Sequence, residues 1–212
     1  MSMLEVISFV VSIFGVWLTT TRSLWNYPFS LLSVALYGAL FYQAKLYADM
    51  GLQGVFACTL LYGLWQWTRG RSASGDVLIT RLGTNEALIS IVAGSVAAGT
   101  LGFLLHAHTD ASLPWVDSLL FAASLVASVW AARRNIESWW MWIAVDIFYV
   151  GMYCFKHLYL MAILYAIFIA LAVLGLRRWQ FAFERQSDNK DTDLHPPRAA
   201  FIVELHNVRG KT

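Results

Sequence analysis

The chain has few charged residues and lacks the residue patterns that most enzymes require. Only 13% of its 212 residues are charged, about half of what a soluble domain carries. It has no HExxH, GxSxG, GxGxxG or phosphate-loop motif, so the sequence predicts no enzyme and no ATP-driven pump. Its two cysteines, Cys58 and Cys154, have no metal-ligand spacing. We therefore expect no metal, no cofactor and no nucleic-acid partner.

The chain contains long runs of apolar residues. The chain is 58% hydrophobic and 15% aromatic, and a helix that crosses a bilayer needs about 20 mostly apolar residues. The sequence therefore predicts an all-α integral membrane protein with seven transmembrane helices and the lipid bilayer as its solvent. The predicted spans are residues 4–20, 24–44, 50–68, 86–106, 114–132, 137–155 and 158–176.

The positive charges predict how these spans are oriented. Of the 15 Lys and Arg residues, 13 fall on one face of the predicted topology, and only Lys45 and Lys156 fall on the other. Cytoplasmic loops carry the excess of Lys and Arg. We therefore expect the N-terminus on the outer side of the membrane and the C-terminus in the cytoplasm. The polar residues 181–212 are expected to form a mobile cytosolic tail.

An internal repeat covers about half of the chain. Residues 31–67 match residues 143–179 at a constant offset of 112, and one residue of slippage further back aligns Val16-Trp17 with Val129-Trp130. Both copies lie in apolar stretches, so the repeat belongs to the membrane domain. The matched pairs are Tyr37 and Tyr149, Leu46-Tyr47 and Leu158-Tyr159, Leu52 and Leu164, Phe56 and Phe168, Gly63 and Gly175, and Trp67 and Trp179.

The repeat predicts the domain organisation. Its period is four helices, so both copies face the same way across the membrane. The first repeat covers residues 4–68, a linking helix covers residues 86–106, and the second repeat covers residues 114–179. Together they form a transporter domain over residues 1–180, because parallel repeats with a site between them are a common transporter plan.

Polar and aromatic side chains form stripes on equivalent helices of the two repeats. On the second span they recur at spacings of 4, 3 and 4, which places them on one helix face. The sixth span carries a similar stripe, and the third and seventh spans add a face each. We expect these stripes to line a central path for a substrate. The candidate binding residues are Asn26, Ser33, Tyr37, Gln53, Trp139, Trp142, Asp146, Tyr149 and Tyr165.

Asp146 is the most informative of these residues. It lies near the middle of its span, where an ionised group costs at least about 2.5 kcal/mol to insert. We expect it to contact a substrate, in particular a cation; the alternative is a hydrogen bond that holds two helices together. Trp142, one turn away, is expected to stack on a flat cationic ring. Trp139 lies nearer the span end, where an anchoring aromatic belt is the alternative.

Several segments resemble one known family. They are Leu24-Trp25-Asn26-Tyr27-Pro28, the stretch from Tyr42 to Gln53, the stretch from Trp139 to Asp146, and the stretch from Gly175 to Trp179. Over about residues 15–180 the chain resembles the PnuC family of bacterial nicotinamide riboside transporters. The resemblance implies a three-plus-one-plus-three helix fold, similar in architecture to the SWEET sugar transporters.

The resemblance also implies an activity. It implies facilitated diffusion of nicotinamide riboside, a precursor for NAD biosynthesis, across the inner membrane. A cytosolic kinase, supplied by another protein, would make uptake one-way by phosphorylating the cargo. Similar proteins carry thiamine or other B vitamins, and the four matching segments do not separate these cargoes. The sequence leaves open whether the protein is a homo-oligomer.

Two hypotheses from other classes compete with transport. One is a membrane scaffold or sensor whose tail binds a cytosolic partner, and the other is a membrane-embedded enzyme. Paired polar and aromatic stripes favour transport, because a scaffold has no need of such a path. The missing catalytic motifs disfavour the enzyme.

Overall fold

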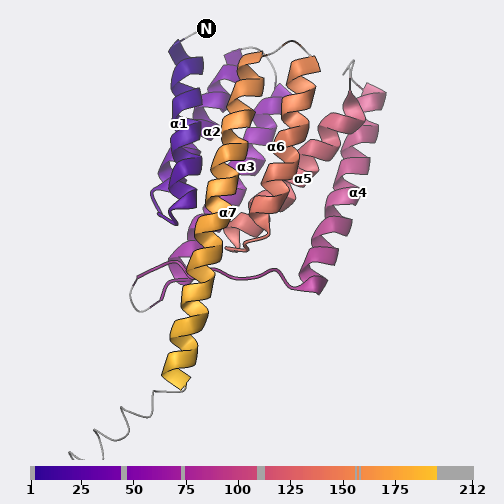
Figure 1. Ribbon diagram of the computed structural model, residues 1–212. Helices are drawn as coiled ribbons and strands as arrows, with labels where there is room; N and C mark the ends of the chain where they lie inside the picture. The colour runs from indigo at the N-terminus through magenta and orange to yellow at the C-terminus, as the bar shows by residue number, and fades with distance from the viewer. Residues whose placement is uncertain are drawn as a thin grey trace, which may run out of the picture.

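The chain folds into a bundle of α-helices (Figure 1). The computed structural model describes residues 3–43, 47–72, 75–108, 113–155, 157 and 159–194. Each of the seven predicted spans coincides with one helix in this part of the chain, so the predicted all-α fold is confirmed. The helices are α1 (Met3–Thr20), α2 (Asn26–Gln43), α3 (Tyr47–Arg69), α4 (Thr84–His108), α5 (Pro114–Ala132), α6 (Ser138–Phe155) and α7 (Tyr159–Leu194).

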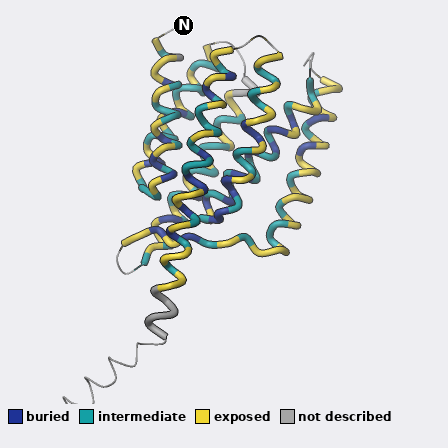
Figure 2. The backbone as a smooth tube through the Cα atoms, viewed as in Figure 1, coloured by how far each residue is buried: buried dark blue, intermediate teal, exposed yellow. Residues whose placement is uncertain are grey.

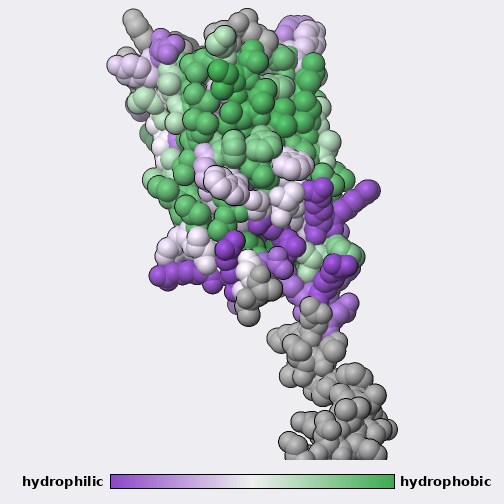
Figure 3. All heavy atoms as spheres, turned by 90° about the vertical axis from the view of Figure 1, so that its left-hand side faces the viewer, coloured by the Kyte–Doolittle hydropathy of each residue, from purple (hydrophilic) through white to green (hydrophobic). Residues whose placement is uncertain are grey.

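The outer surface of the bundle is apolar. Helices α4, α5 and α7 are long and apolar enough, by length and composition, to cross a membrane, and most of the apolar stretch of α4 is exposed. On α4, Leu88, Ile89, Val92 and Val96 all face outward. Figure 2 shows the exposed residues along α4, and Figure 3 shows the side of the bundle opposite α4, with apolar atoms over the helices and the most strongly polar atoms toward the lower end. Such a surface suits lipid rather than water.

Six of the helices form a closed ring. Helix α1 packs on α2 and α7, α3 packs on α2 and α5, and α6 packs on α5 and α7. Helix α4 packs on α5 outside the ring, at one edge of the bundle (Figure 1). Among the described residues no helix of the ring has a backbone contact with the helix opposite it. The ring therefore surrounds a centre that only side chains fill.

The turns that follow α1 and α5 have the same backbone conformation. Arg22 and Arg134, which are 112 residues apart, both adopt positive φ angles, of 60° and 69°. One residue further along, the amide of Ser23 donates to the carbonyl of Leu18, and the amide of Asn135 donates to that of Trp130. Leu18 and Trp130 are again 112 residues apart, so the offset holds without interruption at this end.

This continuity corrects one sequence prediction. The one-residue slippage that aligned Val16-Trp17 with Val129-Trp130 is wrong, because Leu18 and not Trp17 occupies the place of Trp130. The sequence alignment paired Trp17 with Trp130 because both are tryptophan, but the equivalent positions carry different side chains, Leu18 and Trp130.

Helix α7 is longer than its predicted span. It continues to Leu194, and Ala182 is buried in the core. The amide of Ile79 donates to the side-chain oxygen of Gln186 at 3.2 Å, which ties this extension to the segment after α3. Residues 181–194 are thus helical rather than the start of a mobile tail. Residues 195–212 lie outside the described part of the chain.

Candidate functional site

Buried aromatic side chains fill the centre of the helix ring at the end where Arg22 and Arg134 lie, which we call the arginine-rich end. The ring of Tyr27 meets that of Trp67 edge-on at 5.4 Å, and Trp139 meets Trp179 edge-on at 5.3 Å. The ring centres of Trp67 and Trp179 also lie 5.7 Å apart, so the two pairs are in contact across the centre of the helix bundle. We call Tyr27, Trp67, Trp139 and Trp179 the aromatic plug. All four are almost completely buried.

Two glycines make room for the plug. A Cβ atom on Gly63 would lie 2.8 Å from the hydroxyl oxygen of Tyr27, and one on Gly175 would lie 2.5 Å from the ring of Trp139. Gly63 and Gly175 are repeat mates, and so are Tyr27 and Trp139. Each repeat therefore uses the same close contact between its second and third helices.

Reciprocal hydrogen bonds fasten the two repeats together at the plug. The indole nitrogen of Trp67 donates to the carbonyl oxygen of Ala131 at the end of α5, at 3.1 Å. The indole nitrogen of Trp179 donates to that of Thr19 at the end of α1, at 3.2 Å. Ala131 and Thr19 are themselves 112 residues apart. The third helix of each repeat is thus held to the first helix of the other.

A tyrosine cluster lies deeper in the bundle, away from the plug. The rings of Tyr149 and Tyr165 are 4.6 Å apart, and Tyr153 lies 5.9 Å from Tyr149 and 5.4 Å from Tyr165. Tyr165 also lies within electrostatic reach of Tyr37 of α2. Helices α2, α6 and α7 therefore present aromatic rings and hydroxyl groups to a common space.

Serines of α1 and α5 extend this polar lining. The hydroxyls of Ser12 and Ser33 are 2.7 Å apart, and Ser12 also pairs with Tyr37. Ser124, the repeat mate of Ser12, pairs with Tyr149 in the same way. Sequence reasoning missed Ser12 and Ser124. The offset of 112, applied one helix further back, would have found both.

Asp146 is buried beside the tyrosine cluster. Only 3% of its surface is exposed, and it lies within electrostatic reach of Tyr149 and Tyr165. Its carboxylate makes no ion pair with any other described residue. A buried carboxylate without a counter-ion is costly.

Several predicted site residues come together around this space. Ser33, Tyr37, Asp146, Tyr149 and Tyr165 are linked by hydrogen bonds, ring contacts and electrostatic interactions. Gln53 of α3 is half-buried and lies against α2. A Cβ atom placed on Gly38 of α2 would lie 3.9 Å from the Cβ atom of Gln53. Trp142 is half-buried one turn from Asp146, and it packs against the buried core that contains the plug.

Two predicted site residues have other contacts. Trp139 belongs to the plug, where its ring lies on Gly175 and Trp179. Asn26 is buried at the start of α2, and its side-chain amide donates to the carbonyl of Ser23 at 2.8 Å. Both lie at the arginine-rich end rather than beside Asp146. Their helical spacing placed them on the right stripe but gave no depth along the path.

Two three-helix repeats around a common centre, within an apolar bundle, are a common plan of multi-pass membrane transporters. Over residues 2–181 the chain matches the model of the nicotinamide mononucleotide transporter family. The chain therefore belongs to this family.

Characterised relatives include two vitamin transporters. The chain is 32% identical to the riboflavin/roseoflavin transporter RibM of Streptomyces davaonensis, over 78% of this chain and 79% of RibM. It is 24% identical to the nicotinamide riboside transporter PnuC of Escherichia coli, over 84% and 85% of the two chains. A crystal structure of the vitamin B3 transporter PnuC has the same fold, with a TM-score of 0.70, 24% identity, and coverage of 86% of this chain and 82% of that one. The predicted resemblance to the PnuC family is confirmed.

Proposed function

We propose that this protein is a facilitative transporter of nicotinamide riboside. The observation that carries the proposal is Asp146, a buried carboxylate without an ion-pair partner among the described residues, beside the rings of Tyr149 and Tyr165. Nicotinamide riboside carries a flat, positively charged pyridinium ring. Its charge would offset that of Asp146, and its ring would stack on Trp142 or on the tyrosines.

The rest of the cargo suits the remaining polar groups. The ribose of nicotinamide riboside carries hydroxyls and no phosphate. Ser33, Tyr37 and Gln53 offer hydroxyl and amide groups on the first-repeat side of the path. In this arrangement the second repeat recognises the charged ring and the first repeat recognises the sugar.

Transport would require the aromatic plug to open. The plug closes the arginine-rich end, which the count of positive charges assigns to the cytoplasm. Because the plug joins the two repeats through Trp67 and Trp179, a small rotation of one repeat against the other would separate these rings. Uptake would be downhill, and a cytosolic kinase would trap the cargo by phosphorylation.

Riboflavin is the second candidate cargo, because RibM is 32% identical to this chain. Riboflavin is also flat and aromatic, but its ring system is neutral. Thiamine, a further alternative, shares the cationic ring of nicotinamide riboside. The charge on the cargo is therefore the property that separates riboflavin from the other two.

Calorimetry on the purified protein tests the cargo. We expect nicotinamide riboside to bind, and to bind more tightly than thiamine or riboflavin. Tighter binding of riboflavin would overturn the assignment and favour the cargo named for RibM. Failure of all three vitamins to bind would favour the scaffold or sensor hypothesis.

Uptake into sealed vesicles without a kinase tests the energetics. We expect labelled nicotinamide riboside to equilibrate across the membrane and to rise no further. Adding a nicotinamide riboside kinase and ATP inside the vesicles should then increase the retained label. Accumulation of unmodified cargo above the external concentration would contradict facilitated diffusion.

A further inference from the structure

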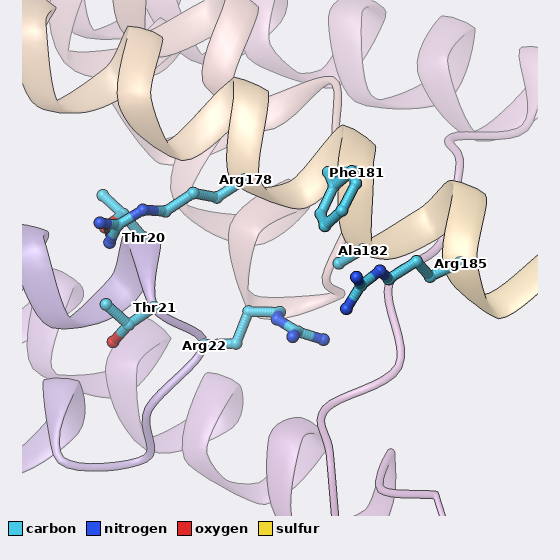
Figure 4. A pocket seen from close by; sticks show the side chains of 7 residues that line it. All are labelled: Thr20, Thr21, Arg22, Arg178, Phe181, Ala182 and Arg185. Atoms are coloured by element: carbon cyan, nitrogen blue, oxygen red, sulfur yellow. Dashed lines mark hydrogen bonds between the residues drawn. The ribbon is translucent and has the colours of Figure 1, made fainter.

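A pocket opens at the arginine-rich end, outside the ring (Figure 4). It has a volume of about 360 Å³, within the range of small-molecule sites. It lies where the end of α1 meets the part of α7 that continues beyond the bundle, so it is separate from the central path. Its lining includes Thr20, Thr21, Arg22, Arg178, Phe181 and Arg185.

The three arginines of this pocket are held in place by neutral groups. Arg178 donates to the hydroxyl of Thr20 at 3.0 Å, and Arg22 donates to the carbonyl of Val77 at 3.3 Å. The guanidinium of Arg185 lies over the ring of Phe181, 4.4 Å from its centre. The ion pair seen among the described residues, between Arg133 and Glu86, involves none of the three.

This arrangement leaves a concentrated positive charge. Figure 4 shows the side chain of Arg22, from the turn after α1, and that of Arg185, from α7, pointing toward one another. Like charges that share one pocket repel each other unless an anion lies between them. The pocket therefore has the electrostatics of an anion site.

The second repeat shows what happens when such an arginine is covered. Arg134 is the repeat mate of Arg22 and has the same positive φ. It donates to the carbonyls of Gly70 at 3.0 Å and Leu78 at 3.3 Å, in the segment that follows α3. Burial there lowers the pKa of Arg134 from its usual value. Helix α7 continues as a helix instead of forming such a segment. Arg22 therefore has one carbonyl partner, Val77 of the segment after α3, where Arg134 has two.

An apolar stripe leads from the pocket along α1. Val10, Phe14 and Trp17 are all exposed, at spacings of 4 and 3, and Thr21 in the pocket continues the same face. Figure 3, which looks at this side of the molecule, shows apolar atoms above a band of strongly polar side chains. A ligand with an anionic head and apolar tails would match both parts.

We propose that this pocket binds the phosphate of an anionic phospholipid, with the acyl chains along the stripe on α1. Guanidinium groups match phosphate oxygens in geometry as well as in charge. Basic pockets between transmembrane helices on the cytoplasmic side are sites for anionic headgroups. A free phosphate ester offers the same head chemistry, but it makes no use of Val10, Phe14 or Trp17.

Thermal unfolding of the purified full-length protein tests the proposal and separates the two sources of phosphate. The protein is compared in phosphatidylcholine alone, in equal parts of phosphatidylcholine and phosphatidylglycerol, and in phosphatidylcholine with added inorganic phosphate. We expect phosphatidylglycerol to raise the unfolding temperature and inorganic phosphate to leave it unchanged. Equal stabilisation by inorganic phosphate would overturn the lipid assignment, and no stabilisation by either would overturn the site.

Matched variants locate the effect. Arg185→Gln should lower the affinity for phosphatidylglycerol about fivefold, and adding Arg178→Gln should lower it further by a similar factor. Arg185→Lys should keep most of it. The control is Arg69→Gln, because Arg69 also lies over an aromatic ring, 4.3 Å from the centre of Trp65, but outside the pocket. An equal loss in the control would show a general surface charge effect and would contradict the proposal.

Discussion

The two repeats are most alike at the arginine-rich end and least alike beside the tyrosine cluster. At the plug, Trp67 and Trp179 make equivalent ring contacts and equivalent hydrogen bonds. The glycines at positions 63 and 175 accommodate their neighbours in the same way. Residues that hold the repeats together are thus nearly interchangeable between them, as expected for two units that move against each other symmetrically.

Beside the cluster the same offset keeps the serine–tyrosine contacts of the two repeats but pairs unlike residues around Asp146. Asp146 corresponds to Val34, and Trp142 corresponds to Ser30. Tyr165 occupies the place of Gln53. A cargo such as nicotinamide riboside has no twofold symmetry, so a site that binds its ring on one side and its sugar on the other must differ between the repeats. Under the proposed function, the comparison separates the residues that serve packing from those that serve recognition.

The glycine pair offers the largest effect on stability. Gly63→Ala and Gly175→Ala should each destabilise the protein by about 1–3 kcal/mol, because the new methyl group overlaps a packed ring. The control is Gly151→Ala, where a Cβ atom meets nothing within 4 Å and the helix should gain about 0.5–1 kcal/mol. Thermal unfolding in detergent measures all three. Destabilisation by only one of the two would show that the repeats are packed differently.

The tryptophan pair should give a smaller and matched effect. Trp67→Phe and Trp179→Phe should each cost about 1–2 kcal/mol, since each removes one indole hydrogen bond to a helix end and part of a buried ring. The double variant should be non-additive, because the two rings are in contact. Unfolding of the two single variants and the double variant checks this. Strictly additive losses would mean that the plug does not act as one unit.

Trp142 tests the unlike part of the comparison. Trp142→Ala should weaken binding of nicotinamide riboside by up to about thirtyfold, since a cation–π contact contributes about 0.5–2 kcal/mol. The equivalent change in the first repeat, Ser30→Ala, should have little effect on affinity. Calorimetry measures both. Trp142 also packs on the core, so lost stability with unchanged affinity would assign it to packing instead.

Much of this fold could be predicted from the sequence because membranes impose simple rules. The seven apolar runs, the offset of 112 and the polar stripes follow from residue types and spacings alone. The stripes identify Ser33, Tyr37, Asp146, Tyr149 and Tyr165 without any knowledge of their contacts. Spacing fixes which face of a helix a residue lies on, and these residues face a common space.

Depth along the path and contacts between repeats could not be predicted in this way. Asn26 and Trp139 share the stripes but lie at the closed end, and nothing in their spacing separates them from Tyr37 or Asp146. The pairing of Trp67 with Ala131 joins distant parts of the chain. The helical extension of α7 was missed because its polar composition resembles that of a tail, whereas its packing on the segment after α3 is a tertiary contact.

Calorimetric binding of nicotinamide riboside to Asp146→Asn tests the central claim most directly. This variant keeps the size of the side chain and removes its charge. The control is Glu137→Gln, which also removes one charge but keeps an acceptor for the amide of Leu82. We predict about a tenfold or larger loss of affinity in Asp146→Asn, with an unfolding temperature no lower than that of the wild type, and wild-type affinity in the control. A stable Asp146→Asn protein with wild-type affinity would contradict the account.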